Sequence, residues 1–170
     1  MWRSLLAVKN SISACYYNRK TDEGFEAITA KVNLHKHGIT NFTAIYNAPG
    51  NQLTDNHIKE LLPSNQKSIL AGDLNAKNTA WGCNATNRNE RNLKKAIENE
   101  NLYIHIPDRP TYYPSFTDRR PDILDIAIMN FKINCSTNTV TELLSDHLPV
   151  LMYITGAAYD NTKIINSYNQ

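Results

Sequence analysis

The sequence predicts an α/β fold in which strands and amphipathic helices alternate along one domain. Residues 25–34 alternate between apolar and polar side chains, which is typical of a strand with one buried face. Helical spacing of apolar residues follows over residues 53–62 and ends before Pro63, and a short apolar strand at residues 68–73 comes directly after it. The chain has 170 residues, which favours one domain because domains hold roughly 100–200 residues.

Further strands are expected in the N-terminal part of the chain. Residues 4–17 are mostly apolar, β-branched or aromatic, which predicts one strand or two short ones. Turn residues at 22–24 and 37–38 flank the alternating strand. We therefore expect a hairpin from that strand into another at residues 42–46.

The following part of the chain predicts a second helix and a long loop. The helix covers about residues 88–100, with Asn87 and Glu90 in the positions of a capping pair. A short apolar strand is expected at residues 102–106. The segment 107–121 contains four prolines and no helical period, so it is predicted to be an extended loop of the kind that often carries function.

Two apolar strands near the C-terminus are associated with polar residues. Residues 123–129 are typical of an interior strand buried on both faces, but they include Asp125. An unpaired buried charge is costly, so this carboxylate needs a partner. The polar trio 145–147 directly precedes another apolar strand, which ends at Ile154.

Composition excludes several classes of protein. A net charge of +2 gives no sign of a strongly basic nucleic-acid binder, and three distant cysteines without Cys-x-x-Cys predict neither a zinc site nor a disulfide framework. The apolar run at residues 5–8 is shorter than a signal-peptide core of about 7–15 residues, and no stretch approaches a membrane span. We expect an intracellular, soluble protein without membrane contact, folded over residues 1–156 and ending in a polar tail at 157–170.

Polar side chains at the predicted strand ends form the candidate site. Asp73 and Asn75 belong to a Gly-Asp-x-Asn motif, which is also ordinary turn chemistry. Metal-assisted phosphodiester hydrolysis needs a carboxylate to deprotonate water, an amide to hold the phosphate and an imidazole oriented by a second carboxylate. His147 and Asp125 supply the last two groups, although a capped or core role is the alternative for this histidine.

Four motifs resemble those of the exonuclease–endonuclease–phosphatase superfamily in order and rough spacing. They are Tyr46-x-x-Pro49, Gly72-Asp73-Leu74-Asn75, Asp122-Ile123-Leu124-Asp125 and Ser145-Asp146-His147-Leu148-Pro149. More narrowly, four stretches look like the endonuclease domain of non-LTR (LINE-type, jockey-like) retrotransposons. These stretches are GDLNAKNTAWGC, NLYIHIPDRPTYYP, RRPDILDIAI and LLSDHLPVLM. The resemblance covers about residues 4–155.

This resemblance implies a two-sheet α/β sandwich and an endonuclease that nicks DNA to give a 3′-hydroxyl that primes reverse transcription. The enzyme would use Mg²⁺, with Mn²⁺ as a substitute. Asp73 would position the attacking water, while Asn75 and Tyr46 would contact the phosphate. His147, with Asp125 behind it, would bind the scissile phosphate oxygen.

The resemblance also suggests metal and DNA contacts outside this set. Asp146 would lie near the metal. Trp81, Arg119 and Arg120 are candidate DNA contacts, and a packed or exposed structural role is an equal alternative for each. A functional protein of this kind would act on DNA in the nucleus.

The sequence departs from the family at its N-terminal end. The family's first strand carries an asparagine, and a following segment carries the glutamate that is the principal Mg²⁺ ligand. Neither has a match here, since the first glutamate, Glu23, lies in a predicted turn. We therefore expect an N-terminally truncated domain that lacks its first strands, with weakened metal binding, an exposed sheet edge and impaired activity. A partner or a longer precursor would have to supply the missing strands.

Two other functions stay open. The first is a catalytically dead remnant or domesticated domain that binds nucleic acid or protein without cutting, which the missing glutamate favours. The second is a phosphohydrolase of the same superfamily that acts on a small phosphoester, because substrate choice depends on loops whose conformation the sequence does not reveal.

Overall fold

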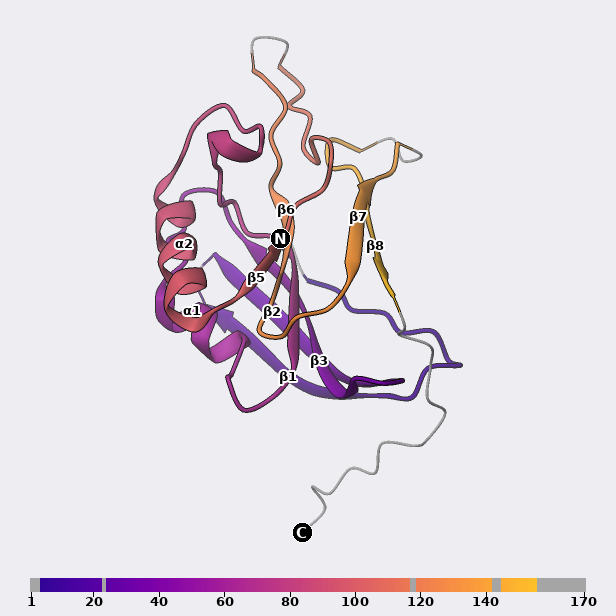
Figure 1. Ribbon diagram of the computed structural model, residues 1–170. Coiled ribbons are helices and arrows are strands. Elements are labelled where there is room, and N and C mark those ends of the chain that lie inside the picture. The colour runs from indigo at the N-terminus through magenta and orange to yellow at the C-terminus, as the bar shows by residue number, and fades with distance from the viewer. Residues whose placement is uncertain (1–3, 23, 117–118, 142–144, 156–170) are drawn as a thin grey trace.

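Two helices and a small second sheet lie on opposite faces of a six-stranded sheet in the computed structural model (Figure 1). The structure describes residues 4–22, 24–116, 119–141 and 145–155. The large sheet has the strand order β1-β2-β3-β4-β6-β5, and the second sheet pairs β7 with β8. The strands are β1 (Ala14–Asp22), β2 (Phe25–Leu34), β3 (Gly38–Asn47), β4 (Ser68–Asp73), β5 (Tyr103–His105), β6 (Asp125–Met129), β7 (Cys135–Thr139) and β8 (Val150–Ile154). The helices are α1 (Asp55–Leu61), the short 3₁₀ helix η1 (Thr79–Trp81) and α2 (Arg88–Glu100).

The two α-helices cover one face of the large sheet and enclose the main core. Helix α2 has the boundaries that the sequence predicts, and the Asn87 side chain caps it by accepting a hydrogen bond from the Glu90 N–H at 3.0 Å. Leu93 of α2, Ile58 of α1 and Leu70 of β4 are all fully buried in this core. Burial of each such side chain contributes roughly 2 kcal/mol to stability.

The strand–helix–strand unit around α1 is confirmed. Strands β3 and β4 are parallel and are joined through α1, so their C-terminal ends meet at one edge of the sheet. The hairpin of β2 and β3 is confirmed too, although β3 begins at Gly38, four residues before the predicted start. Strand β6 runs antiparallel to β4, which brings the start of β6 to the same edge.

Several boundaries differ from the predictions. The prediction of strand over residues 4–17 is wrong for residues 4–13, because β1 begins at Ala14 and the preceding segment lies outside the sheet. Ser4 instead hydrogen-bonds to Glu26 through its backbone N–H and its hydroxyl group. Asp125 is the first residue of β6 and its side chain is 25% exposed, so it is not buried within the strand as the sequence suggests.

The second sheet is small and packs on the face of the large sheet opposite the helices. Met152 and Ile154 of β8 contact a cluster that includes Met129 of β6, whereas Leu151 and Tyr153 point outward and are 45% and 57% exposed. Within the described residues, no helix is long and apolar enough to cross a lipid bilayer. The predicted polar tail, 157–170, lies outside the described residues.

Replacing Gly72 by alanine should destabilise the fold by about 3 kcal/mol or more. Gly72 has a φ of 142°, and an added Cβ would overlap the backbone carbonyl of Ile45 in the neighbouring strand. Gly50→Ala is the matched control, because Gly50 has a φ of 85° and open space around the added Cβ. We expect it to cost only about 1 kcal/mol. Urea unfolding of both variants tests the difference, and equal costs would contradict the role of close backbone packing at Gly72.

Candidate active site

A row of three polar side chains crosses adjacent strands at the edge where β3 and β4 end. Tyr46 of β3 is paired with Asp73 of β4, and Asp73 is paired in turn with Asp125 of β6. Side chains at paired positions point to the same face of a sheet. Strand register therefore sets a phenol and two carboxylates side by side, which are the groups that the sequence motifs single out.

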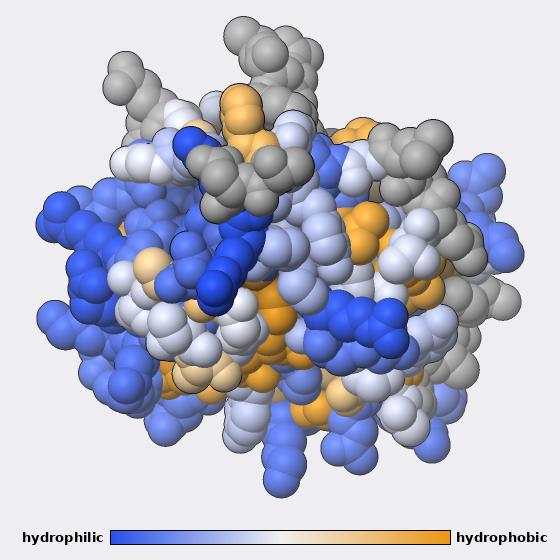
Figure 2. Space-filling view, turned by 90° about the horizontal axis from the view of Figure 1, so that it is seen from above, coloured by the Kyte–Doolittle hydropathy of each residue, from blue (hydrophilic) through white to orange (hydrophobic). Residues whose placement is uncertain are grey.

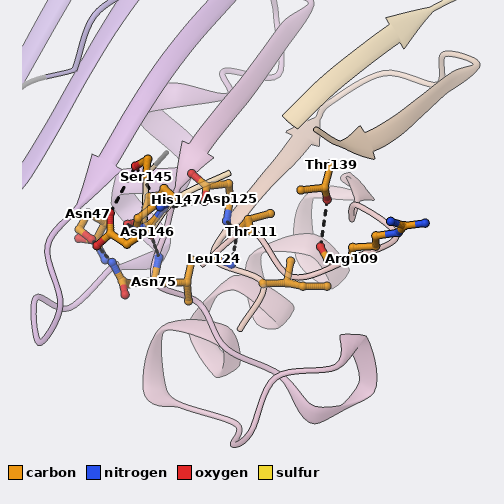
Figure 3. Close-up of polar contacts among 12 residues, drawn as sticks. Asn47, Asn75, Arg109, Thr111, Leu124, Asp125, Thr139, Ser145, Asp146 and His147 are labelled. Carbon is orange, nitrogen blue, oxygen red and sulfur yellow. Dashed lines mark hydrogen bonds and ion pairs between the residues drawn. The ribbon is translucent and has the colours of Figure 1, made fainter. Parts of the chain in front are cut away.

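His147 comes from the loop before β8 and lies beside both carboxylates. Its Nδ1 atom is 3.0 Å from Oδ2 of Asp125, and its Nε2 atom is 4.0 Å from Oδ2 of Asp73. Figure 3 shows Asp125, His147 and Asn75 converging from separate segments of the chain. The shorter distance is a hydrogen bond, whereas the longer one leaves room for an oxygen atom that bonds to both groups at about 2.8 Å.

The two carboxylates of the row, Asp73 and Asp125, favour the protonated, positively charged form of His147. Burial, together with the nearby charge of Asp125, raises the pKa of Asp73 to about 6, although hydrogen bonds from Asn75 and the charge of His147 oppose the shift. The hydrogen bond with Asp125 raises the pKa of His147 above its ordinary value of 6.5, with smaller contributions from the charges of Asp125, Asp73 and Asp146 and opposition from desolvation. The imidazolium form therefore offsets the repulsion between the carboxylates.

Asn75 forms a turn directly after β4. Its backbone N–H donates to Oδ1 of Asp73 at 2.9 Å, and its side-chain amide donates to the carbonyl of Asn47 at 2.8 Å. Its φ of 46° is left-handed, a conformation that asparagine tolerates better than most residues. The motif thus makes the turn chemistry expected of Gly-Asp-x-Asn and also places Asn75 at the site.

Thr111 and Tyr112 of the proline-rich loop hold the start of β6 close to the loop that carries His147. The Thr111 hydroxyl accepts hydrogen bonds from the N–H groups of Leu124 and Asp125 at 3.0 and 3.1 Å, and the Thr111 carbonyl accepts from the N–H of Leu148 at 2.7 Å. The ring of Tyr112 packs against the His147 imidazole with centroids 4.9 Å apart. Thr111 is fully buried. Neither role is predictable from the sequence, because a single hydroxyl or ring in a loop has no periodic pattern.

Tyr46, Asp73, Asn75 and His147 line a cleft of about 790 Å³, whereas Asp125 lines a separate cavity of about 410 Å³. Figure 2 views the molecule from the end that carries the long loops, where hydrophilic side chains surround a band of hydrophobic ones. Seventeen residues line the cleft: Tyr46, Pro49, Gly50, Asn51, Gln52, Asp73, Asn75, Lys77, Asn87, Arg88, Asn89, Tyr112, Arg119, Leu124, Ser145, Asp146 and His147. Lys77, which we did not predict, lines the cleft and forms an ion pair at 2.5 Å with Asp122, which is buried and does not line the cleft. Both residues lie within the quoted motif stretches.

The donor atoms of the cleft are of the kind that Mg²⁺ prefers. Carboxylate and amide oxygens are present at Asp73, Asp146 and Asn75, and no cysteine lines the cleft. Within the described ranges, however, no group of three or more histidine, cysteine or acidic side chains is placed to hold a metal ion. The residues fit an ion held jointly with a phosphate substrate, because Mg²⁺ is often bound through one or two carboxylates plus substrate phosphates.

Comparison with protein families now identifies the chain. The sequence profile described as "Endonuclease-reverse transcriptase" matches residues 40–151, which include the row of Tyr46, Asp73 and Asp125 and also His147. The chain belongs to the endonuclease-reverse transcriptase family. The resemblance to non-LTR retrotransposon endonucleases that the motifs suggest is thereby confirmed.

Similar proteins agree with this assignment. Over 130 residues the chain is 30% identical to the probable RNA-directed DNA polymerase from transposon X-element of Drosophila melanogaster, covering 75% of this chain and 14% of that protein. It is 29% identical over 121 residues to the corresponding protein from transposon BS of the same organism, covering 69% of this chain and 13% of that protein. The chain therefore spans about one seventh of the length of these relatives.

A solved structure supports the predicted two-sheet α/β fold. The endonuclease domain of TRAS1, a telomere-specific non-LTR retrotransposon, superimposes with a TM-score of 0.59 at 15% sequence identity. The match covers 86% of this chain and 70% of that one. The likeness shows that the two chains share a fold.

The remaining predicted residues of this family member lie at different places. Asp146 and Arg119 line the cleft, and the Arg119 guanidinium lies over the Phe116 ring at 5.6 Å. Arg120 is exposed and does not line the cleft. Trp81 packs partly buried against the main core and is also absent from the cleft lining, so the structure favours the packed alternative for this residue.

Asp73→Asn should increase the free energy of unfolding at pH 8 by about 2 to 3 kcal/mol. A carboxyl group whose pKa rises from 3.8 to about 6 on folding opposes folding when it is ionised. The native state binds the proton more tightly, so the gain should fall below about 1 kcal/mol at pH 4, where the folded wild type is largely protonated and the unfolded chain is partly protonated. Urea unfolding at the two pH values measures this gain in free energy of unfolding, with the exposed Asp108→Asn as control. A stability of Asp73→Asn below that of the wild type at pH 8 would contradict this account.

Thr111→Val should destabilise the protein by about 2 to 4 kcal/mol, since it keeps the shape of the side chain but leaves two N–H groups without their acceptor. Thr139→Val is a matched control, because the Thr139 hydroxyl makes one bond, to the carbonyl of Arg109 at 3.1 Å, in an exposed position (Figure 3). We expect it to cost below about 1 kcal/mol. Thermal unfolding compares the two variants, and a clamp role for Thr111 is wrong if their costs are alike.

Proposed function

We propose that this chain is an endonuclease domain that hydrolyses phosphodiester bonds of DNA and nicks one strand, as in a non-LTR retrotransposon. The observation that carries the proposal is that Asp73 and His147 meet at an open cleft, while Asp125, outside the cleft lining, hydrogen-bonds to His147. A protein that only bound DNA would not need two carboxylates in register around an imidazole, because that arrangement opposes folding and does not attract phosphate.

The residues divide the reaction between them. Asp73 accepts a proton from the attacking water, for which a pKa near 6 is suitable at neutral pH. In its imidazolium form, His147 donates from Nδ1 to Asp125 and presents a second N–H, at Nε2, that stabilises negative charge on the phosphate. The 4.0 Å separation between Asp73 and His147 is where one of the reacting oxygens would lie, bonded to both groups. Tyr46 and Asn75 line the same part of the cleft and contact the phosphate.

A bound Mg²⁺ or Mn²⁺ would act as a Lewis acid on the phosphate. Asp146, together with substrate oxygens, would hold it. The second candidate function is DNA binding without cleavage. It is favoured by the absence, among the described residues, of a group of three side chains that could hold the metal without substrate.

Incubation of the protein with supercoiled plasmid and Mg²⁺ tests the proposal. We expect nicked circles that EDTA abolishes, and a loss of rate of about 10²- to 10⁴-fold for Asp73→Asn and His147→Gln. Asp108→Asn, an exposed carboxylate outside the cleft, should cut at the wild-type rate. If the folded wild-type protein cuts with neither Mg²⁺ nor Mn²⁺ but still binds DNA, the binding-only function is correct. Equal rates for Asp73→Asn and Asp108→Asn would overturn the role of Asp73.

A further inference from the structure

The cleft is also lined by residues to which the reaction itself assigns no role. These residues, called the distal part of the cleft below, come from the loop after β3, which contributes Asn51 and Gln52, and from the start of α2, which contributes Asn87, Arg88 and Asn89. None of these residues belongs to the row of Tyr46, Asp73 and Asp125. The side chains of the distal part should therefore contact substrate groups other than the scissile phosphate.

Asparagine side chains in this distal part are occupied by hydrogen bonds within the protein. Asn87 donates to the carbonyl of Asn75 at 2.7 Å and accepts from the N–H of Lys77 at 3.1 Å. Asn89 donates to the carbonyl of Asn51 at 2.9 Å and accepts from the N–H of Leu53 at 2.9 Å. These bonds tie the start of α2 to the turn that carries Asn75. The residue between the two asparagines is therefore held at a fixed place relative to the catalytic row.

That residue is Arg88, whose side chain is exposed at the cleft. The other lysine and arginine side chains that line the cleft in the described part of the chain have neighbours of their own: Lys77 is paired with Asp122, and Arg119 lies over Phe116. Within the described part of the chain, Arg88 has no ion pair or side-chain hydrogen bond. Glu90, two residues further along α2, is buried and bonded to Asn78. Arg88 thus has a fixed backbone position at the cleft and an exposed guanidinium that is available to an anion.

We propose that Arg88 binds a phosphate of the substrate outside the scissile bond, so that the cleft takes a polynucleotide strand and not a small phosphoester. The inference rests on the proposed function for the identity of the scissile bond. A DNA strand carries a negative charge at every nucleotide, whereas a small phosphodiester carries one in total. A guanidinium in the distal part of the cleft therefore adds binding energy only for a substrate that extends beyond the reacting phosphate.

Arg88→Gln and Arg91→Gln form a matched pair that tests the proposal. Both arginines are exposed on α2, but Arg91 does not line the cleft. Arg88→Gln should weaken binding of a fluorescent DNA duplex in EDTA by about 5-fold and reduce the salt dependence of log Kd by about one counterion. In Mg²⁺ it should raise KM for nicking by a similar factor and leave kcat unchanged. Hydrolysis of bis(4-nitrophenyl) phosphate should be unaffected, and Arg91→Gln should match the wild type in every assay.

The outcomes separate this inference from the proposed function. Equal effects of the two substitutions on DNA binding would overturn the role of Arg88 even if the protein nicks DNA normally. An equal loss on DNA and on the small diester would also overturn it, because the guanidinium would then act on the reacting phosphate. If the wild type cuts nothing, the binding assay still decides: a loss confined to Arg88→Gln, with a smaller salt dependence, supports the phosphate contact while the endonuclease proposal falls.

Discussion

Two carboxylates that face each other across β4 and β6 constrain the rest of the site. Asp73 and Asp125 are fixed by strand register, so neither can move away from the other without loss of sheet pairing. Like charges directly opposite in a sheet are destabilising. His147 relieves that repulsion, but it lies in a loop distant in sequence, which must be held close to the sheet. Thr111 does so by bonding to the backbone of both segments, which makes the proline-rich loop part of the catalytic scaffold.

The sequence predicts those elements whose signals are local and strong. Strand β2 alternates cleanly, and α2 has a helical period with a cap, so their boundaries are right. Strand β7, with the sequence CSTNT, has no apolar pattern and exists because β8 pairs with it. Conversely, the apolar residues before β1 suggest a strand, but no neighbouring strand pairs with them among the described residues. Pairing partners decide both cases, and a single sequence does not show them.

The candidate site follows the same rule. Motif chemistry predicts Asp73, Asp125 and His147 because acids and histidine at strand ends are unusual, and the structure brings them together. The residues that hold them could not be predicted, since Thr111 acts through a hydroxyl that any loop threonine carries. The ring of Trp81 was equally ambiguous, because an aromatic side chain in a loop serves packing and recognition alike. The cleft wall likewise depends on hydrogen bonds that asparagine side chains donate to backbone carbonyls. These bonds join the loop after β3, the turn after β4 and the start of α2, which are far apart in the sequence.

The second sheet bears on how the protein behaves at high concentration. Strand β8 pairs only with β7 in the described part of the chain, carries no charged residue, and exposes Leu151 and Tyr153. Natural edge strands usually avoid self-association through lysines, prolines, bulges or a covering element. Strand β8, Val150–Ile154, contains neither lysine nor proline. Pairing of β8 strands from different molecules should therefore limit the concentration that the protein reaches before it self-associates.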